Sequence, residues 1–160
     1  MTIKVGDTIP SMKLMMATPD GPKETSTDEI FKGKKVVLFA VPGAFTPTCS
    51  VKHMPGFVEN AAAIKAKGVD TVACVAVNDA FVMGAWGKEQ GTTGKVVMLA
   101  DGSGAFTKAL GLELDLISRG MGVRSQRYAL VAQDGKVTHL GLEQPGGFDV
   151  SRAESILAAL

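Results

Sequence analysis

The chain has 160 residues, of which 46% are apolar and 21% are charged, and its formal net charge at pH 7 is +1. This composition is typical of one globular domain spanning residues 1–160 and excludes a disordered or fibrous chain. The low net charge, without a basic run, argues against nucleic acid as a main partner. The longest apolar runs, such as residues 36–41, are far shorter than the roughly 20 residues of a membrane-spanning helix.

The N-terminal sequence MTIKVGD favours a cytoplasmic protein, because it has neither the apolar core of a secretory signal nor the Arg- and Ser-rich pattern of a transit peptide. A mature organellar form whose presequence had been removed would look the same. Cys49 and Cys74 are too few for a disulfide framework. His53 and His139 form no ligand cluster with them, so we expect no metal site.

The first half of the chain predicts an extended arm followed by alternating strands and helices. Residues 1–25, which contain several prolines, predict the arm with one turn. A capping-box pattern, Ser-x-x-Glu, predicts a short helix over residues 27–32. The continuous apolar run at residues 36–41 predicts a central strand covered on both faces. Apolar residues at helical spacing over residues 49–68 predict a helix, which Pro55 should bend.

The second half continues this alternation. It predicts, in chain order, a buried strand, a helix, a third strand and a short helix (residues 72–77, 79–90, 95–99 and 104–110). Asp134-Gly135 lies between the apolar runs at residues 128–132 and 137–142 and is a strong hairpin signal. A second capping-box pattern, which begins at Ser151, predicts a C-terminal helix.

Strands separated by helices predict an α/β fold. After the arm, the order β-α-β-α-β-α-β-β-α favours a mostly parallel central sheet with an antiparallel C-terminal hairpin and helices on both faces. This order is compatible with a thioredoxin-like fold.

The segment Pro-Gly-Ala-Phe-Thr-Pro-Thr-Cys at residues 42–49 is the strongest chemical signal in the chain. It places Cys49 where a buried strand gives way to a helix N-terminus, and the backbone N–H groups there favour an anion. A thiolate is the nucleophilic form of cysteine, and Thr46 can offer a hydroxyl to the same pocket. A lone cysteine is more often a buried inert side chain, but the hydroxyl-bearing neighbours of Cys49 favour the reactive interpretation.

The spacing Pro-x-x-x-Thr-x-x-Cys, made by Pro42, Thr46 and Cys49, resembles the active-site motif of the peroxiredoxins, which are thiol peroxidases. The longer string PGAFTPTCS resembles their type II branch. Further similarity covers nearly the whole chain and includes Val77-Asn78-Asp79, Leu99-Ala100-Asp101-Gly102-Ser103 and Arg124-Ser125-Gln126-Arg127-Tyr128-Ala129.

The resemblance implies a thioredoxin fold and the reduction of hydrogen peroxide or alkyl hydroperoxides through a sulfenic acid on Cys49. It implies no metal, haem, flavin or nucleotide cofactor. The reductant would be glutaredoxin with glutathione, or thioredoxin, and the protein would form a homodimer around the active-site loops.

The resemblance also implies roles for individual residues. Thr46 would orient the peroxide, beside its ordinary role in a turn, and Pro42 would shield Cys49, or would simply end the strand. An arginine that opens the strand after the long loop would sit beside the thiolate. Arg127 matches that placement, and Arg124 is the alternative. A guanidinium there would favour the thiolate and donate to the departing oxygen.

Three further residues leave alternatives open. Cys74 lies in the middle of a predicted strand, where a buried inert thiol is the usual interpretation. Type II members, however, often have a resolving cysteine at this spacing. A disulfide with Cys49 needs Cα atoms within about 7 Å, so it would require the Cys49 turn to unwind. His53 could act as a base or could pack against the helix surface. Trp86 is expected in the core or in a pocket wall, and a contact with substrate is the alternative.

Two other functions compete with a peroxidase. A general thiol–disulfide oxidoreductase normally carries Cys-x-x-Cys, but Thr46 and Lys52 occupy the positions on either side of Cys49 where its second cysteine would stand. A redox sensor would use Cys49 only as a switch and would react with peroxide at the slow rate of a free thiol.

Overall fold

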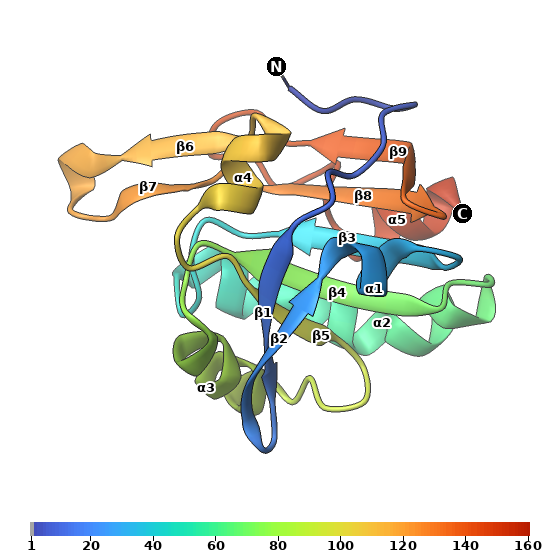
Figure 1. The fold of residues 1–160 in the computed structure, drawn as a ribbon, viewed down its shortest axis with the longest axis horizontal. Coiled ribbons are helices and arrows are strands. Elements are labelled where there is room, and N and C mark those ends of the chain that lie inside the picture. Colours follow the sequence, from blue (N-terminus) through green and yellow to red (C-terminus); the bar gives the residue numbers. More distant parts are fainter. Residues whose placement is uncertain (1) are drawn as a thin grey trace.

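A mixed sheet of seven strands forms the centre of the computed structural model, which describes residues 2–160 (Figure 1). Its strand order is β2-β1-β5-β4-β3-β8-β9. The three central strands are parallel: β3 (Lys35–Ala40), β4 (Thr71–Ala76) and β5 (Val97–Ala100). Antiparallel strands extend both edges: β1 (Lys13–Thr18) and β2 (Gly21–Ser26) beyond β5, and β8 (Tyr128–Gln133) and β9 (Lys136–Leu142) beyond β3.

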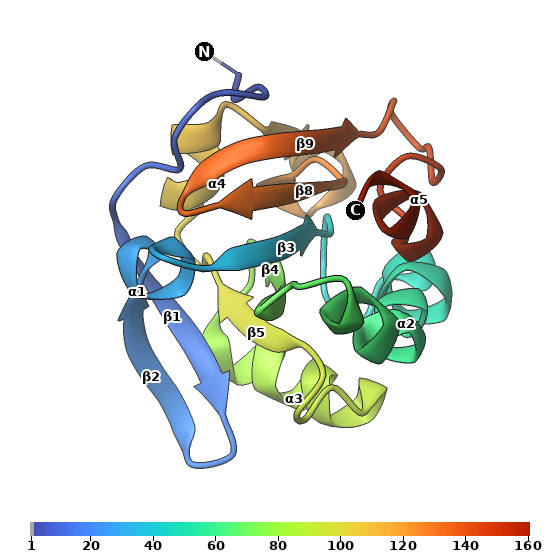
Figure 2. The same cartoon turned by 90° about the vertical axis from the view of Figure 1, so that its right-hand side faces the viewer.

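Helices cover both faces of this sheet (Figure 2). One face carries α2 (Met54–Ala66), α3 (Ala80–Gln90) and α5 (Ala153–Ala159). The other face carries α1 (Thr27–Phe31), α4 (Ala105–Leu110) and the N-terminal segment. No helix among residues 2–160 has the length and apolar character needed to cross a membrane.

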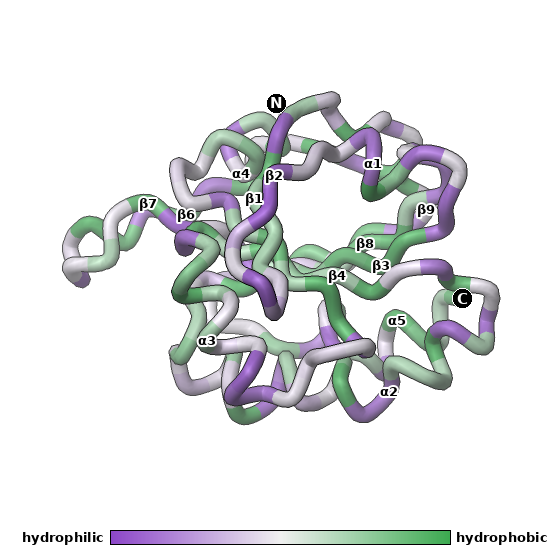
Figure 3. The backbone as a smooth tube through the Cα atoms, turned by 60° about the horizontal axis from the view of Figure 1, so that its bottom comes forward, coloured by the Kyte–Doolittle hydropathy of each residue, from purple (hydrophilic) through white to green (hydrophobic). Residues whose placement is uncertain are grey.

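The alternation of side chains along β3 divides the core into two layers. Val37 and Phe39 pack with the helices of the first face, whereas Val36 and Leu38 pack on the opposite face. All four side chains are fully buried, as expected for a strand covered on both sides. Figure 3 shows the same hydrophobic stretches along β3, β4 and β8 at the middle of the molecule.

The α/β architecture expected from the sequence is confirmed, and its helices and central strands lie close to the predicted positions. The predicted N-cap of the first helix is also present, since Ser26 Oγ accepts a hydrogen bond from the N–H of Glu29 at 3.2 Å, but the Glu29 carboxylate accepts from the Thr25 hydroxyl and does not complete the capping box. Asp134 and Gly135 have φ values of 51° and 78° and make the hairpin turn between β8 and β9.

The structure differs from these expectations in four places. The N-terminal arm is a β-hairpin, β1–β2, whose first strand pairs with β5 and lengthens the sheet. A small two-stranded sheet, β6 (Glu113–Leu116) and β7 (Gly122–Ser125), was not predicted and projects from the body of the molecule (Figure 1). Each of its strands has only four residues, and Ser125 is the one buried residue among them, so they leave little hydrophobic pattern in the sequence.

The second capping box is the third difference. The residue before α5 is Arg152, which makes no side-chain capping bond. The helix begins one residue later than the pattern predicts, and the Ser151 hydroxyl donates to Glu143 Oε2 at 2.6 Å.

The helix expected over residues 49–68 is divided into two parts. Residues Cys49–His53 form a π-helical turn, in which the N–H of Met54 bonds to the carbonyl of Cys49, and α2 follows. Pro55 has no N–H, so the wider hydrogen-bond pattern cannot continue past it. The candidate site begins at this turn.

Candidate active site

The loop that leads to the Cys49 turn starts directly beyond the carboxyl end of β3. Its backbone is held by a hydrogen bond from Ser50 N to Thr46 O (2.9 Å) and by one from Ala44 N to Asn78 Oδ1 (2.9 Å). Phe45, at φ 65°, adopts a left-handed conformation that non-glycine residues rarely adopt. Such strain is maintained only where the surrounding structure imposes it, and it is concentrated at functional sites.

The Cys49 sulfur lies between two polar side chains. Thr46 Oγ1 is 2.8 Å from Cys49 Sγ and 2.6 Å from the carbonyl oxygen of Gly43. The hydroxyl has one proton, so it can donate to a thiolate, or it can donate to Gly43 and accept from a thiol. On the other side, Arg127 Nη2 donates to Cys49 Sγ at 3.1 Å. Cys49 itself is fully buried.

Arg127, rather than Arg124, contacts the sulfur. Arg127 immediately precedes β8, and the antiparallel register pairs Tyr128 with Ala40 at the end of β3. Arg124 instead donates from Nε to the carbonyl of Met121 (2.7 Å) and from Nη1 to that of Val77 (3.3 Å).

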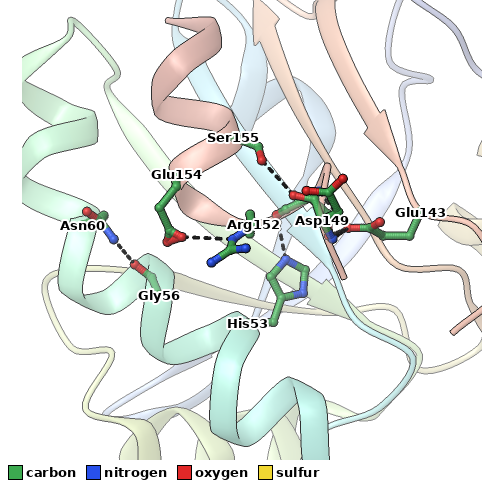
Figure 4. A network of polar contacts seen from close by, with 9 residues as sticks. His53, Gly56, Asn60, Glu143, Asp149, Arg152, Glu154 and Ser155 are labelled. Atoms are coloured by element: carbon green, nitrogen blue, oxygen red, sulfur yellow. Dashed lines mark hydrogen bonds and ion pairs between the residues drawn. The ribbon is translucent and has the colours of Figure 1, made fainter. Parts of the chain in front are cut away.

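His53 is buried, and both of its ring nitrogens are engaged. Nε2 lies 2.9 Å from the carbonyl oxygen of Ser151, and a carbonyl can only accept, so Nε2 carries the proton. Nδ1 therefore has a free lone pair and accepts from Arg127 Nη1 at 2.8 Å. Figure 4 shows the ring pointing toward the segment that precedes α5. Burial and, second, the positive charge of Arg127 lower the pKa of His53 to about 3, so the ring is neutral near pH 7.

The other residues singled out in the sequence lie around this turn or beneath it. Pro42 is half-buried where β3 gives way to the loop. Trp86 is fully buried in the core, as expected, and donates to Ser50 Oγ at 2.9 Å. Cys74 is fully buried on β4, in the same core layer as Cys49, and both thiols are free. Burial, and next the proximity of Cys49, raise the pKa of the Cys74 thiol well above its usual value.

The sequence did not identify three contributors to this site. Asn78 holds the loop, and Ser151 and Glu143 lie behind His53. The match of Val77-Asn78-Asp79 to the peroxiredoxin pattern was the one available signal for Asn78. Ser151 uses its backbone carbonyl, which no residue pattern reveals. Within residues 2–160, no group of three or more His, Cys, Asp or Glu residues has the arrangement of a metal site.

Comparison with known proteins places this geometry in a family. The model of the Redoxin family matches residues 4–157. The chain is 51% identical over 163 residues to the chloroplastic Peroxiredoxin-2E of Arabidopsis thaliana, covering 99% of this chain and 70% of that protein. It is also 54% identical to reduced Prx3 of Vibrio vulnificus, which was solved in complex with hydrogen peroxide. That comparison covers 99% of both chains, with a TM-score of 0.94.

The chain belongs to the peroxiredoxin family. It is therefore a peroxidase, an oxidoreductase with the thioredoxin-like fold, and its similarity to Peroxiredoxin-2E fits the type II peroxiredoxins.

One similar structure carries a different name. A chain from Burkholderia cenocepacia described as a putative thioredoxin reductase is 53% identical, with a TM-score of 0.98, and the match covers 100% of this peroxiredoxin and 99% of that chain. Both this match and the match to Prx3 extend over the whole fold, so this difference in name does not alter the family.

Burial of a neutral His53 predicts a loss of stability in acid. The unfolded chain protonates this ring near pH 6.5 and the folded chain only near pH 3, so stability is complete above pH 6.5 and declines as the pH falls toward about 3. Between pH 7 and pH 4 the free energy of unfolding should fall by about 3 kcal/mol more in the wild type than in His53→Gln. Urea unfolding at both pH values measures this difference. Equal losses in the two proteins would contradict it.

Proposed function

We propose that this peroxiredoxin reduces hydrogen peroxide and alkyl hydroperoxides through a sulfenic acid on Cys49. The thiolate attacks the terminal peroxide oxygen, an S–O bond forms and the O–O bond breaks. The sulfur is oxidised and the peroxide is reduced. The departing oxygen takes up a proton and leaves as water or an alcohol. The reduction of peroxides serves antioxidant defence and redox homeostasis.

The observation that carries this proposal is the position of the Cys49 sulfur between Thr46 Oγ1 and the Arg127 guanidinium. The positive guanidinium stabilises the thiolate before the reaction. Its donors, with the Thr46 hydroxyl, are in place to hold the two peroxide oxygens while charge moves toward the departing oxygen. Pro42, at the end of β3, shields the sulfur from water and from further oxidation.

The remaining steps rest on the family. We assign glutaredoxin with glutathione, or thioredoxin, as the reductant that returns Cys49 to the thiol. Apart from the family, we also propose a cytoplasmic location. We further propose a homodimer built around the active-site loops. Phe45 and Phe81 support it, since these aromatic side chains are 53% and 76% exposed on segments that the Ala44–Asn78 hydrogen bond joins.

Replacement of Cys49 by serine should abolish peroxide reduction and leave the fold intact, because serine has no thiolate. Peroxide consumption, assayed separately with glutaredoxin/glutathione and with thioredoxin, measures the activity, and circular dichroism checks the fold. After one equivalent of peroxide, mass spectrometry of the wild type should find the added oxygen on Cys49. Its appearance only on Cys74 or on a methionine would contradict the assignment.

Replacement of Arg127 by alanine should slow the reaction with peroxide, since one charge-assisted contact to the reacting sulfur is lost. Such a contact is worth about 1.5–3 kcal/mol, which corresponds to roughly 10- to 150-fold in the rate constant. Arg124→Ala is the matched control and should cost clearly less, because Arg124 bonds to carbonyl groups away from the sulfur. Stopped-flow kinetics compare the rate constants of the two variants with peroxide. A larger loss in Arg124→Ala than in Arg127→Ala would mean that Arg124 is the arginine that assists the reaction.

Replacement of Cys74 by serine should leave most of the activity with glutaredoxin and glutathione. Cys74 is buried in the middle of β4, so its reaction with Cys49 would require part of the core to open. Non-reducing peptide maps of the oxidised wild type with glutathione should show little Cys49–Cys74 disulfide. If a folded Cys74→Ser variant loses nearly all turnover, Cys74 is the resolving thiol.

A further inference from the structure

We infer that Glu143 is a positioning residue for Arg127 and acts on it through Ser151 and His53. The inference rests on the proposed roles of Cys49 and Arg127 and adds to them the structure that orients the guanidinium. The contacts form one continuous chain from a buried carboxylate to the reacting sulfur.

The first step is the fixed direction of the Arg127 donors. A guanidinium is planar and rigid, so a bond at one terminal nitrogen restricts the direction of the other. Nη1 bonds to His53 Nδ1 at 2.8 Å and Nη2 bonds to Cys49 Sγ at 3.1 Å. A rotation of the His53 ring would therefore move the donor that reaches the sulfur.

The second step is the orientation of His53. Its Nε2–H donates to the carbonyl of Ser151, which fixes the tautomer as well as the plane of the ring. This is the arrangement by which a partner on one imidazole nitrogen controls what the other nitrogen does. Phe39, Phe57 and Phe148 surround the ring, with centroids 5.0–5.5 Å away, and offer it no other hydrogen-bond partner.

The third step is the position of Ser151, which precedes α5 in a segment without regular structure. Glu143 Oε2 accepts from Ser151 N (2.8 Å), Ser151 Oγ (2.6 Å) and Asp149 N (2.7 Å). Gly141 allows this segment to approach β9, because a Cβ at position 141 would overlap the carbonyl of Val150. One carboxylate oxygen therefore sets the place of the Ser151 carbonyl.

Glu143 is also tied to Arg127 through the backbone. Glu143 N donates to the carbonyl of Arg127 at 3.1 Å, just beyond the pairing of β8 with β9. Burial by itself would raise the pKa of Glu143, but the hydrogen bonds from Ser151 and from the N–H groups of Asp149 and Val150 outweigh it and lower that pKa. The carboxylate therefore stays charged and keeps its full capacity to accept.

Glu143→Gln tests the inference, because an amide keeps the size of the side chain but removes its charge, so its oxygen is a weaker acceptor for the three hydrogen bonds that Oε2 receives. The rate constant for oxidation by hydrogen peroxide should fall about tenfold, the cost of misplacing one hydrogen bond to the sulfur. The ultraviolet absorbance of the thiolate at neutral pH should also fall. Glu154→Gln, an exposed glutamate next to the same segment, is the matched control and should change neither value.

The same substitution in an Arg127→Ala background separates positioning from general loosening. If Glu143 acts through Arg127, the double variant should react no more than about twofold slower than Arg127→Ala alone. If Glu143→Gln lowers the rate constant for oxidation equally in both backgrounds, or lowers it in neither, the inference is overturned. If Arg127→Ala itself does not slow oxidation, the proposed role of Arg127 in peroxide reduction is contradicted. That result differs from one in which Arg127→Ala slows oxidation but Glu143→Gln does not, which contradicts only the inference about Glu143.

Ser151→Ala repeats the test if Glu143→Gln does not fold. It removes one of the three donors to Glu143 but leaves the Ser151 carbonyl in the chain. The rate should fall about threefold in the wild-type background and should not change in the Arg127→Ala background. A thermally stable Ser151→Ala variant with unchanged kinetics in both backgrounds would overturn the inference.

Discussion

The forked hydrogen bonding of Arg127 is the interaction on which the site depends. One planar cation bonds to the Cys49 sulfur with one nitrogen and to the His53 ring with the other. The sheet makes this possible. The antiparallel register of β3 and β8 places Tyr128 opposite Ala40, so the residue before β8 lies where the chain leaves β3 for the Cys49 turn. The contacts of the sulfur thus depend on the pairing of two strands, β3 and β8, that are far apart in the sequence.

The burial of the site explains why its hydrogen bonds have to be complete. Cys49, His53 and Ser151 are at most 1% exposed, and a buried polar group without a partner costs about 1–3 kcal/mol. Among residues 2–160, every fully buried side-chain nitrogen or oxygen has a hydrogen-bond partner. A second proton on His53 would face the Arg127 guanidinium, so the ring stays neutral near pH 7 and accepts a hydrogen bond from that guanidinium.

The sequence predicted what local spacing determines. Thr46 and Cys49 lie in one turn, so a motif of a few residues identifies both, and the α/β order follows from the alternation of strands and helices. The place of Arg127 before the hairpin and the family resemblance favour it over Arg124, but neither residue reveals the strand pairing that brings Arg127 to the sulfur. The link from His53 to Ser151 spans 98 positions and ends on a backbone carbonyl, which has no residue signature. The Ser-x-x-Glu pattern at Ser151 predicted a helix cap, because the pattern does not include Glu143, the acceptor eight residues earlier that the Ser151 hydroxyl bonds to instead.

The short helix α5 gives the protein a natural place for an optical reporter. It starts two residues after Ser151, packs against α2, and exposes Ala158 to solvent. Oxidation of Cys49 changes the acceptor that Arg127 faces, and continuous hydrogen bonds join that guanidinium to the segment leading into α5. A fluorophore attached at position 158 would therefore report whether oxidation of Cys49 moves the segment that leads into α5.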